Sequence, residues 1–115
     1  MSDHQFIKEY IKDFSRLLVP TDKVIDQLIL VRDLLLEAKN NDNKILIFGN
    51  GGSAAIASHF SVDLTKNAKI RCLNFNEASL ITCFANDYGF EHWAEKAIGF
   101  YGNEGDLLIV ISSSG

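Results

Sequence analysis

The sequence predicts an α/β fold, with a doubly wound parallel sheet preceded by two helices. Residues 45–48 and 107–111 are continuous apolar runs, a pattern typical of parallel strands that are covered on both faces. Segments with helical periodicity alternate with these strands, as expected when helices connect parallel strands. Glycines follow the first run directly, which indicates a sharp turn from strand to helix.

Two helices are expected before the first strand. Ser2 and Gln5 have the spacing of a capping box. An apolar stripe at helical spacing follows, made of Ile7, Tyr10, Ile11, Phe14 and Leu18. Thr21 can cap a second helix over residues 21–39, which is apolar on two sides. We therefore expect both helices to pack on the sheet and on another subunit, with residues 1–40 serving oligomerisation.

The remaining elements follow from periodicity and from the residues that interrupt it. The polar run at 40–43 ends the second helix. After it we expect a strand at 44–48, a helix at 53–66, a strand at 70–75, a short helix at 76–87, a helical apolar face at 90–98 and a strand at 107–111. The sequence stops where a further helix is expected, so residues 41–115 are expected to be the first part of a larger sheet.

Composition and charge narrow the class of protein. With 115 residues, 47% of them apolar and 23% charged, the chain suits one globular domain or a piece of one. The net charge is −4 and Lys and Arg form no cluster, which argues against a nucleic-acid or anionic-membrane partner. No apolar run reaches the roughly 18 residues of a membrane span, and the polar N-terminus is unlike a signal peptide. With no sign of export, we expect Cys72 and Cys83 to be reduced thiols that pack as small apolar groups.

The turn after the first strand predicts an anion site. Gly51 and Gly52 let backbone N–H groups approach a ligand closely. The positive end of the following helix points at the same place. Ser53 can cap that helix and offer its hydroxyl to a ligand oxygen. Phosphate is the anion that these features favour.

A second polar loop follows the last strand and consists of Ser112, Ser113 and Ser114. Ligands of open α/β sheets bind at the carboxyl ends of the strands, so both loops should open on one edge of the sheet. Three hydroxyls with their backbone amides can wrap a phosphate. The alternative interpretation is an ordinary serine turn.

Two further groups of polar residues have alternative interpretations. His59 and Asp63 are four residues apart in a helix and share one face. They suit a general base, two ligands of a metal ion, or a plain surface pair. The stretch 86–90, which contains Asp87, suits either a helix end or hydrogen bonding to the hydroxyls of a ligand.

A nucleotide cofactor is not expected. Gly49, Gly51 and Ala54 satisfy the loose dinucleotide fingerprint. However, two helices precede the first strand, and the second strand does not end in the acidic residue that binds a ribose. The Gly-Lys-Ser/Thr sequence of an ATPase phosphate loop does not occur either.

Taken together, four blocks of the sequence resemble the phosphoheptose isomerases, which belong to the sugar isomerase (SIS) domain superfamily. The blocks are Phe48-Gly49-Asn50-Gly51-Gly52-Ser53-Ala54, His59-Phe60-x-x-Asp63, Asn86-Asp87-Tyr88-Gly89-Phe90 and residues 105–115. Their order and spacing match the family. The resemblance implies a single SIS-type domain over residues 1–115, with a flavodoxin-like three-layer arrangement.

The resemblance also implies a function. Family members are cytoplasmic homotetramers that interconvert sedoheptulose 7-phosphate and D-glycero-D-manno-heptose 7-phosphate, which begins heptose supply for lipopolysaccharide and other bacterial surface polysaccharides. By this resemblance, the substrate-binding residues would be Asn50, Gly51, Gly52, Ser53 and Asp87 for the sugar chain and Ser112, Ser113 and Ser114 for the phosphate. Asp63 would shuttle a proton between adjacent carbons through an enediol. Some members bind Zn²⁺ at the positions of His59 and Asp63.

Two departures from the family pattern keep other functions open. The family usually has Glu where this chain has Asp63, one methylene shorter, and misplacing a base by about 1 Å can cost about 10²-fold in rate. The family's second catalytic group, a His in its C-terminal part, is not among these residues. One alternative is a non-catalytic regulatory SIS domain that binds a sugar phosphate. Another is a purely structural oligomerisation domain built on the helix at 21–39.

Overall fold

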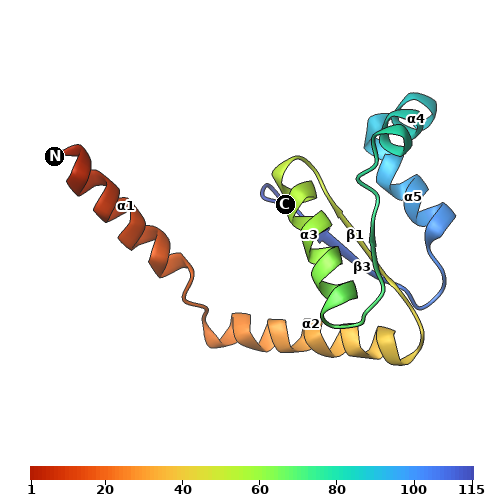
Figure 1. Ribbon diagram of the computed structural model, residues 1–115, viewed down its shortest axis with the longest axis horizontal. Coiled ribbons are helices and arrows are strands. Elements are labelled where there is room, and N and C mark those ends of the chain that lie inside the picture. Colours follow the sequence, from red (N-terminus) through yellow and green to blue (C-terminus); the bar gives the residue numbers. More distant parts are fainter. The chain divides into compact units, whose positions relative to one another are not determined.

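The computed structural model describes residues 1–115. It divides into two compact units, residues 1–33 and 34–115, each described here by itself. The elements, labelled in Figure 1, are α1 (Asp3–Leu17), α2 (Asp22–Asn40), β1 (Ile45–Gly49), α3 (Gly52–Lys66), β2 (Cys72–Asn74), α4 (Ala78–Tyr88), the short 3₁₀ helix η1 (Phe90–His92), α5 (Trp93–Tyr101) and β3 (Leu107–Ile111).

Both N-terminal helices begin at the caps that the sequence predicts. Ser2 Oγ accepts a hydrogen bond from the Gln5 N–H at 3.2 Å. Thr21 Oγ1 accepts one from the Val24 N–H at 3.3 Å. The capping box at Ser2 is only half formed, because the Gln5 side chain donates to Glu9 Oε1 at 3.0 Å instead. Local side-chain chemistry therefore sets where each helix starts.

The apolar stripe of α1 is not covered within the unit of residues 1–33. No residue of α1 is buried, and Phe6, Tyr10 and Phe14 are each more than half exposed. Helix α2 buries Leu35 and Ala38, and the packing of α1 on the sheet and on another subunit stays a prediction. Despite these exposed side chains, none of the helices combines the length and hydrophobicity needed to cross a membrane.

The three strands form the parallel sheet that the apolar runs predict. Their order is β2-β1-β3, and β1 pairs in parallel with both neighbours. The chain passes from β1 through α3 to β2, and then through α4 and α5 back across to β3. This reversal makes the sheet doubly wound and places the switch point between β1 and β3, where open α/β sheets bind ligands.

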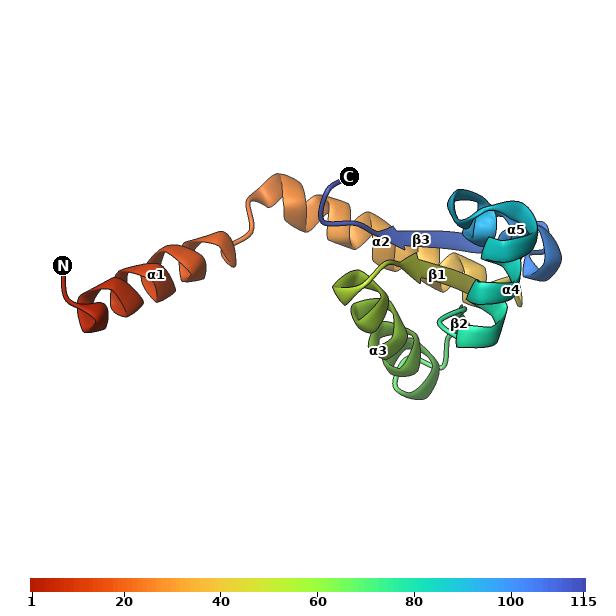
Figure 2. The same ribbon diagram turned by 90° about the horizontal axis from the view of Figure 1, so that it is seen from above.

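Helices cover both faces of the sheet. Ile45 and Ile47 are fully buried on the face that packs against α3 and the last turns of α2. Leu46 and Phe48 point to the other face, where they pack with Trp93 and other residues of α4 and α5. Figure 1 shows α3 on one side of the strands and α4 with α5 on the other, and Figure 2 shows β1 and β3 side by side. Because both faces are covered, β1 is apolar at every position.

The start of α4 differs from the sequence prediction by two residues. The predicted helix at 76–87 begins at Ala78, because Glu77 is its N-cap and its Oε2 accepts a hydrogen bond from the Leu80 N–H at 2.8 Å. Backbone N–H groups of Ser79 and Leu80 lower the pKa of the Glu77 carboxyl. Asn76 therefore lies in the loop after β2, outside the helix.

A buried ion pair joins the beginnings of β1 and β3. Lys44 Nζ lies 2.6 Å from Asp106 Oδ2, and the two side chains are 14% and 6% exposed. Asp106 also accepts hydrogen bonds from the backbone N–H groups of Lys44 at 3.0 Å and Asn103 at 2.7 Å. Burial alone would raise the pKa of Asp106, but these donors outweigh it and lower the pKa to about 2. The pair fixes β3 beside β1 at the amino end of both strands.

Strand β3 forms one edge of the sheet. Its five residues are all apolar, and Leu108 and Val110 are substantially exposed. The outer side of β3 therefore has unpaired backbone groups beside apolar side chains.

Candidate functional site

The turn between β1 and α3 has the geometry of an anion-binding loop. Gly51 is the N-cap of α3, and its φ of 57° lies in the left-handed region that favours glycine. No side chain caps the helix, so its positive end faces the turn directly. The prediction that Ser53 is the cap is wrong, because the helix starts at Gly52 and the Ser53 N–H donates to the Asn50 carbonyl at 3.0 Å.

Gly49 brings the end of β1 into direct contact with the first turn of α3. A Cβ at this position would lie 2.5 Å from the backbone carbonyl carbon and oxygen of Ser53. Only glycine permits this approach. The close packing fixes where the helix starts relative to the sheet.

The serine loop emerges beside the glycine turn. The parallel register pairs Gly49 with Ile111, so Asn50 and Ser112 leave the sheet at the same edge. This is the meeting of the two loops that the sequence predicts. It follows from strand order alone, because parallel neighbours end at the same edge.

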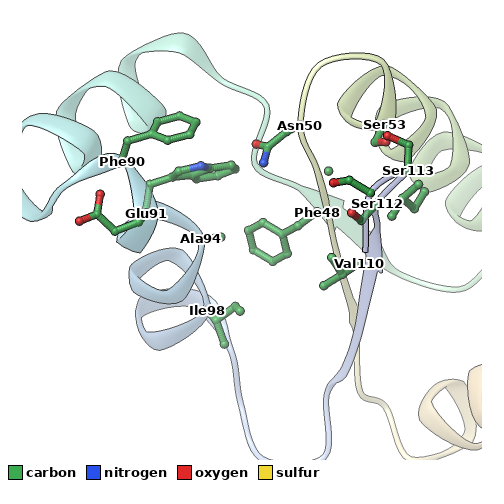
Figure 3. A pocket seen from close by; sticks show the side chains of 14 residues that line it. Phe48, Asn50, Ser53, Phe90, Glu91, Ala94, Ile98, Val110, Ser112 and Ser113 are labelled. Atoms are coloured by element: carbon green, nitrogen blue, oxygen red, sulfur yellow. The ribbon is translucent and has the colours of Figure 1, made fainter.

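A cavity of about 340 Å³ lies between these loops. Of the sequence-predicted site residues, it is lined by Asn50, Ser53, Ser112, Ser113 and Ser114. Figure 3 shows Asn50 and Ser53 near Ser112 and Ser113 at the ends of the strands. Gly51 and Gly52 belong to the same turn but do not line the cavity.

A third wall comes from η1 and α5, and of its residues only Phe90 lies in the corner that the sequence predicts. The wall consists of Phe90, Glu91, Trp93, Ala94 and Ile98. Figure 3 shows Phe90, Glu91, Ala94 and Ile98 across from the serines. Trp93 is the core residue that the sequence indicates, 5% exposed, and its ring lies 5.7 Å from that of Phe48. Glu91 comes directly after the polar stretch at 86–90. This position is the one sequence signal that could have identified Glu91 as a residue of the cavity.

The cavity lining contains one ionisable side chain, Glu91, and no basic one. That carboxylate is largely exposed, with 76% of the side chain accessible. An anion held here would therefore be bound by backbone N–H groups and hydroxyls, as the acidic composition of the chain led us to expect.

His59 and Asp63 lie elsewhere, on an exposed face of α3. Their side chains are 79% and 54% exposed, and His59 Nε2 lies 3.6 Å from Asp63 Oδ1. Neither residue lines the cavity. No set of three or more His, Cys, Asp or Glu side chains lies close enough together to hold a metal ion. The pair therefore supplies two donor atoms and no complete metal site within the chain.

Asp87 is also separate from the cavity lining. It is exposed in the last turn of α4, where it accepts from Cys83 Sγ at 3.6 Å and from Asn86 Nδ2 at 3.2 Å. Its negative charge is the main cause that raises the pKa of the Cys83 thiol. Of the predicted corner at 86–90, only Phe90 reaches the cavity.

Comparison with known sequences agrees with the resemblance of the four blocks. The chain is 36% identical to the phosphoheptose isomerase of Helicobacter pylori strain P12, over all of this chain and 63% of that protein. It is also 36% identical to the phosphoheptose isomerase of Neisseria gonorrhoeae strain NCCP11945, over 80% of this chain and 50% of the relative. The chain thus spans about half to three-fifths of the length of these relatives.

Solved structures show the same fold. The phosphoheptose isomerase of Neisseria gonorrhoeae superposes with a TM-score of 0.84 at 30% identity, covering 96% of this chain and 61% of that one. The enzyme from Francisella tularensis gives a TM-score of 0.83 at 27% identity, over 96% and 60% of the two chains. The sequence model described as the SIS domain matches residues 9–115. Nearly the whole chain, including both loops of the cavity, therefore belongs to the SIS domain family.

Proposed function

We propose that the protein carrying this chain is an aldose–ketose isomerase of sugar phosphates, acting on sedoheptulose 7-phosphate to give D-glycero-D-manno-heptose 7-phosphate. The observation that carries the proposal is the cavity in which the glycine turn and the serine loop meet, with Asn50, Ser53 and Ser112 to Ser114 in its lining. Relatives that share this fold are named phosphoheptose isomerases. Family resemblance adds a cytoplasmic location and a place in heptose supply for lipopolysaccharide and other surface polysaccharides.

The cavity suits the phosphate end of such a substrate. The turn that begins α3 has no capping side chain and contributes Asn50 and Ser53 to the lining. Ser112, Ser113 and Ser114 line the cavity beside this turn. Neutral donors of this kind bind a phosphate through hydrogen bonds, which are strong because the acceptor is charged. Asn50 and Ser53 would then contact the sugar chain.

The proton transfer is assigned to Asp63. A carboxylate removes a proton from the carbon next to the carbonyl while the carbonyl oxygen takes up a proton, which gives an enediol. The carboxyl group then returns its proton to the former carbonyl carbon as the neighbouring hydroxyl loses its proton to leave the new carbonyl; such a group contributes about 10²–10⁴-fold in rate. Asp63 follows Ser53 by ten residues in the same helix, so at about 1.5 Å per residue it lies roughly 15 Å away. It would therefore act on the cavity of a neighbouring copy of the chain.

A homotetramer supplies such neighbours. Support for self-association comes from the N-terminal unit, where the apolar stripe of α1 is exposed along its whole length. Large exposed apolar surfaces mark interaction sites in soluble proteins. The tetramer would cover this stripe and bring α3 of one copy near the loops of another.

Zinc is a further part of the proposal, with His59 and Asp63 as ligands. Their donor atoms are 3.6 Å apart, which suits two ligands each about 2.0–2.2 Å from one Zn²⁺. The remaining ligands would come from outside these two residues. Bound there, zinc would polarise a carbonyl oxygen.

The test uses the purified protein that carries this chain, incubated with sedoheptulose 7-phosphate in D₂O. We expect the aldose to appear with deuterium on the carbon that receives the proton, because the proton that the carboxyl group carries between the two carbons exchanges with solvent. Asp63→Asn should lower kcat by about 10²–10⁴-fold with binding retained. Bound substrate that is never converted would refute the isomerase.

The second candidate is a regulatory SIS domain that binds a sugar phosphate without converting it. The position of Asp63 favours it, because this carboxylate lies outside the cavity lining of its own chain. An Asp63→Glu variant separates the two functions. A gain in turnover supports the enzyme, whereas intact binding with no turnover in either form supports the regulator.

A further inference from the structure

Side-chain hydrogen bonds attach α3 to β2 and the loop after it at three levels. At the C-terminal end of α3, Thr65 Oγ1 accepts from the Cys72 N–H at 3.3 Å. In the middle, Asn74 Nδ2 donates to Ser61 Oγ at 3.0 Å. The third attachment is at the N-terminal end and involves Asn76.

Asn76 makes two hydrogen bonds to the first turns of α3. Its Nδ2 donates to the Ala54 carbonyl at 2.8 Å and to Ser58 Oγ at 2.7 Å. The Asn76 N–H in turn donates to Asn74 Oδ1 at 3.1 Å, which links the two asparagines. Asn76 is half-buried, so water competes less well for these bonds than it would at an exposed site.

The start of α3 has few other fixed points. Its N-cap makes no side-chain hydrogen bond, and a Cβ added at Gly51 or Gly52 would meet nothing within 4 Å. On the sheet side the turn is held by the close contact between Gly49 and Ser53. Asn76 holds the residue after Ser53, through the Ala54 carbonyl.

From this geometry we infer that Asn76 is a positioning residue for the candidate site: it holds the first turn of α3 so that Asn50 and Ser53 face the serine loop. Asn76 does not line the cavity and touches no ligand there. The inference deepens the proposed function and rests on it for the identity of the ligand. Its structural part, the fixed position of the helix start, is measurable without any turnover.

The experiment compares Asn76→Asp with Thr65→Val in the protein that carries this chain. Asn76→Asp keeps the size of the side chain but replaces the donating amide by a carboxylate facing the Ala54 carbonyl. Thr65→Val removes a comparable hydrogen bond at the far end of the same helix. For each variant we measure Kd for sedoheptulose 7-phosphate and hydrogen exchange at the amides of residues 51–55.

We expect Asn76→Asp to weaken sugar-phosphate binding about tenfold or more, because misplacing a binding group by about 1 Å has large effects. The amides of residues 51–55 should exchange faster, while Thr65→Val should leave both measurements unchanged. Equal effects of the two variants, or unchanged exchange in Asn76→Asp, would overturn the inference. Failure of the proposed function would give a different result, because the unmodified protein itself would then not bind or convert the substrate. The hydrogen-exchange comparison of the two variants would still decide the role of Asn76.

Discussion

Strand β1 and helix α1 are both rich in apolar residues, yet their surroundings are opposite. Ile47 of β1 is completely buried, whereas Ile11 of α1 is 57% exposed. The difference does not come from the local pattern, since each sequence forms the element that its periodicity predicts. It comes from the partners within each compact unit: β1 has helices on both faces, and α1 has no buried residue within residues 1–33. Periodicity thus predicts the kind of element and leaves its partner open.

The largest loss of stability is expected at the end of β1, where Gly49 lies directly against the backbone of Ser53. Gly49→Val would place a Cβ 2.5 Å from the carbonyl group of Ser53, so we expect residues 34–115 to lose their folded structure. Circular dichroism and amide NMR spectra would show the loss. Gly52→Ala is the matched control, because its Cβ meets open space and the change should cost little. A folded Gly49→Val protein of normal stability would contradict the close packing.

The next comparison is between the stabilities contributed by two ion pairs, one at the start of β1 and β3 and one in α1. Asp106→Ala should cost about 3–5 kcal/mol of unfolding free energy, because it leaves Lys44 buried without its partner. Asp13→Ala in α1 removes a pair whose side chains are 68% and 72% exposed, and should cost at most about 1 kcal/mol. Urea unfolding of both variants measures the difference. Similar costs would show that the burial of the two pairs does not determine their contribution.

The buried pair also predicts a pH dependence. The pKa of Asp106 is lowered to about 2 in the folded chain, from an ordinary value of 3.8. Its contribution is therefore complete above about pH 4 and is lost as the pH falls through about 2. Unfolding free energy measured between pH 5 and pH 2 should fall less steeply in Asp106→Asn than in the unmodified protein. Parallel curves for the two proteins would show that Asp106 does not cause the pH dependence of stability.

Apolar substitutions compare β1 and α1 directly. Ile47→Ala should cost about 2–5 kcal/mol, from lost burial and the cavity that remains. This loss is measured by denaturant unfolding of the unmodified and variant chains under the same conditions. A cost below about 1 kcal/mol would mean that the core around β1 closes up around the smaller side chain.

The smallest effect is expected for Ile11→Ala, within about 0.5 kcal/mol, because exposed positions change stability little. The same unfolding measurement, repeated over a range of protein concentrations, sharpens the comparison. A large cost that grows at higher concentration would show that copies of the chain bury α1 against one another. That result would support the proposed tetramer and would show that α1 is buried in the assembled protein.

Much of the fold could be predicted because it depends on local rules. Continuous apolar runs predicted β1 and β3, and Ser2 and Thr21 correctly predicted two helix starts. The meeting of the glycine turn and the serine loop also followed, since parallel neighbours end at the same edge. The helix start at α3 was predicted one residue late, because Gly51, which has no side chain, is the N-cap in place of Ser53.

The rest of the site depends on contacts that no spacing rule encodes. Glu91 and Phe90 reach the cavity because η1 and α5 pack across the end of β1. Asp87, which the resemblance assigns to the sugar chain, lies at the end of α4 outside the cavity lining, and its role stays a prediction. Asn76 was expected to begin the helix at 76–87, but Glu77 caps that helix and leaves Asn76 in the preceding loop. The roles of the predicted binding and catalytic residues stay predictions until they are measured.

The free edge of β3 has a practical consequence for anyone who purifies these residues alone. A short, uncharged strand with an open row of amide donors and carbonyl acceptors favours pairing with the same strand of another molecule. Such pairing uses the free β3 edge of both molecules and joins them as a dimer. Concentrated solutions should therefore contain dimers, and Val110→Lys would be the simplest protection.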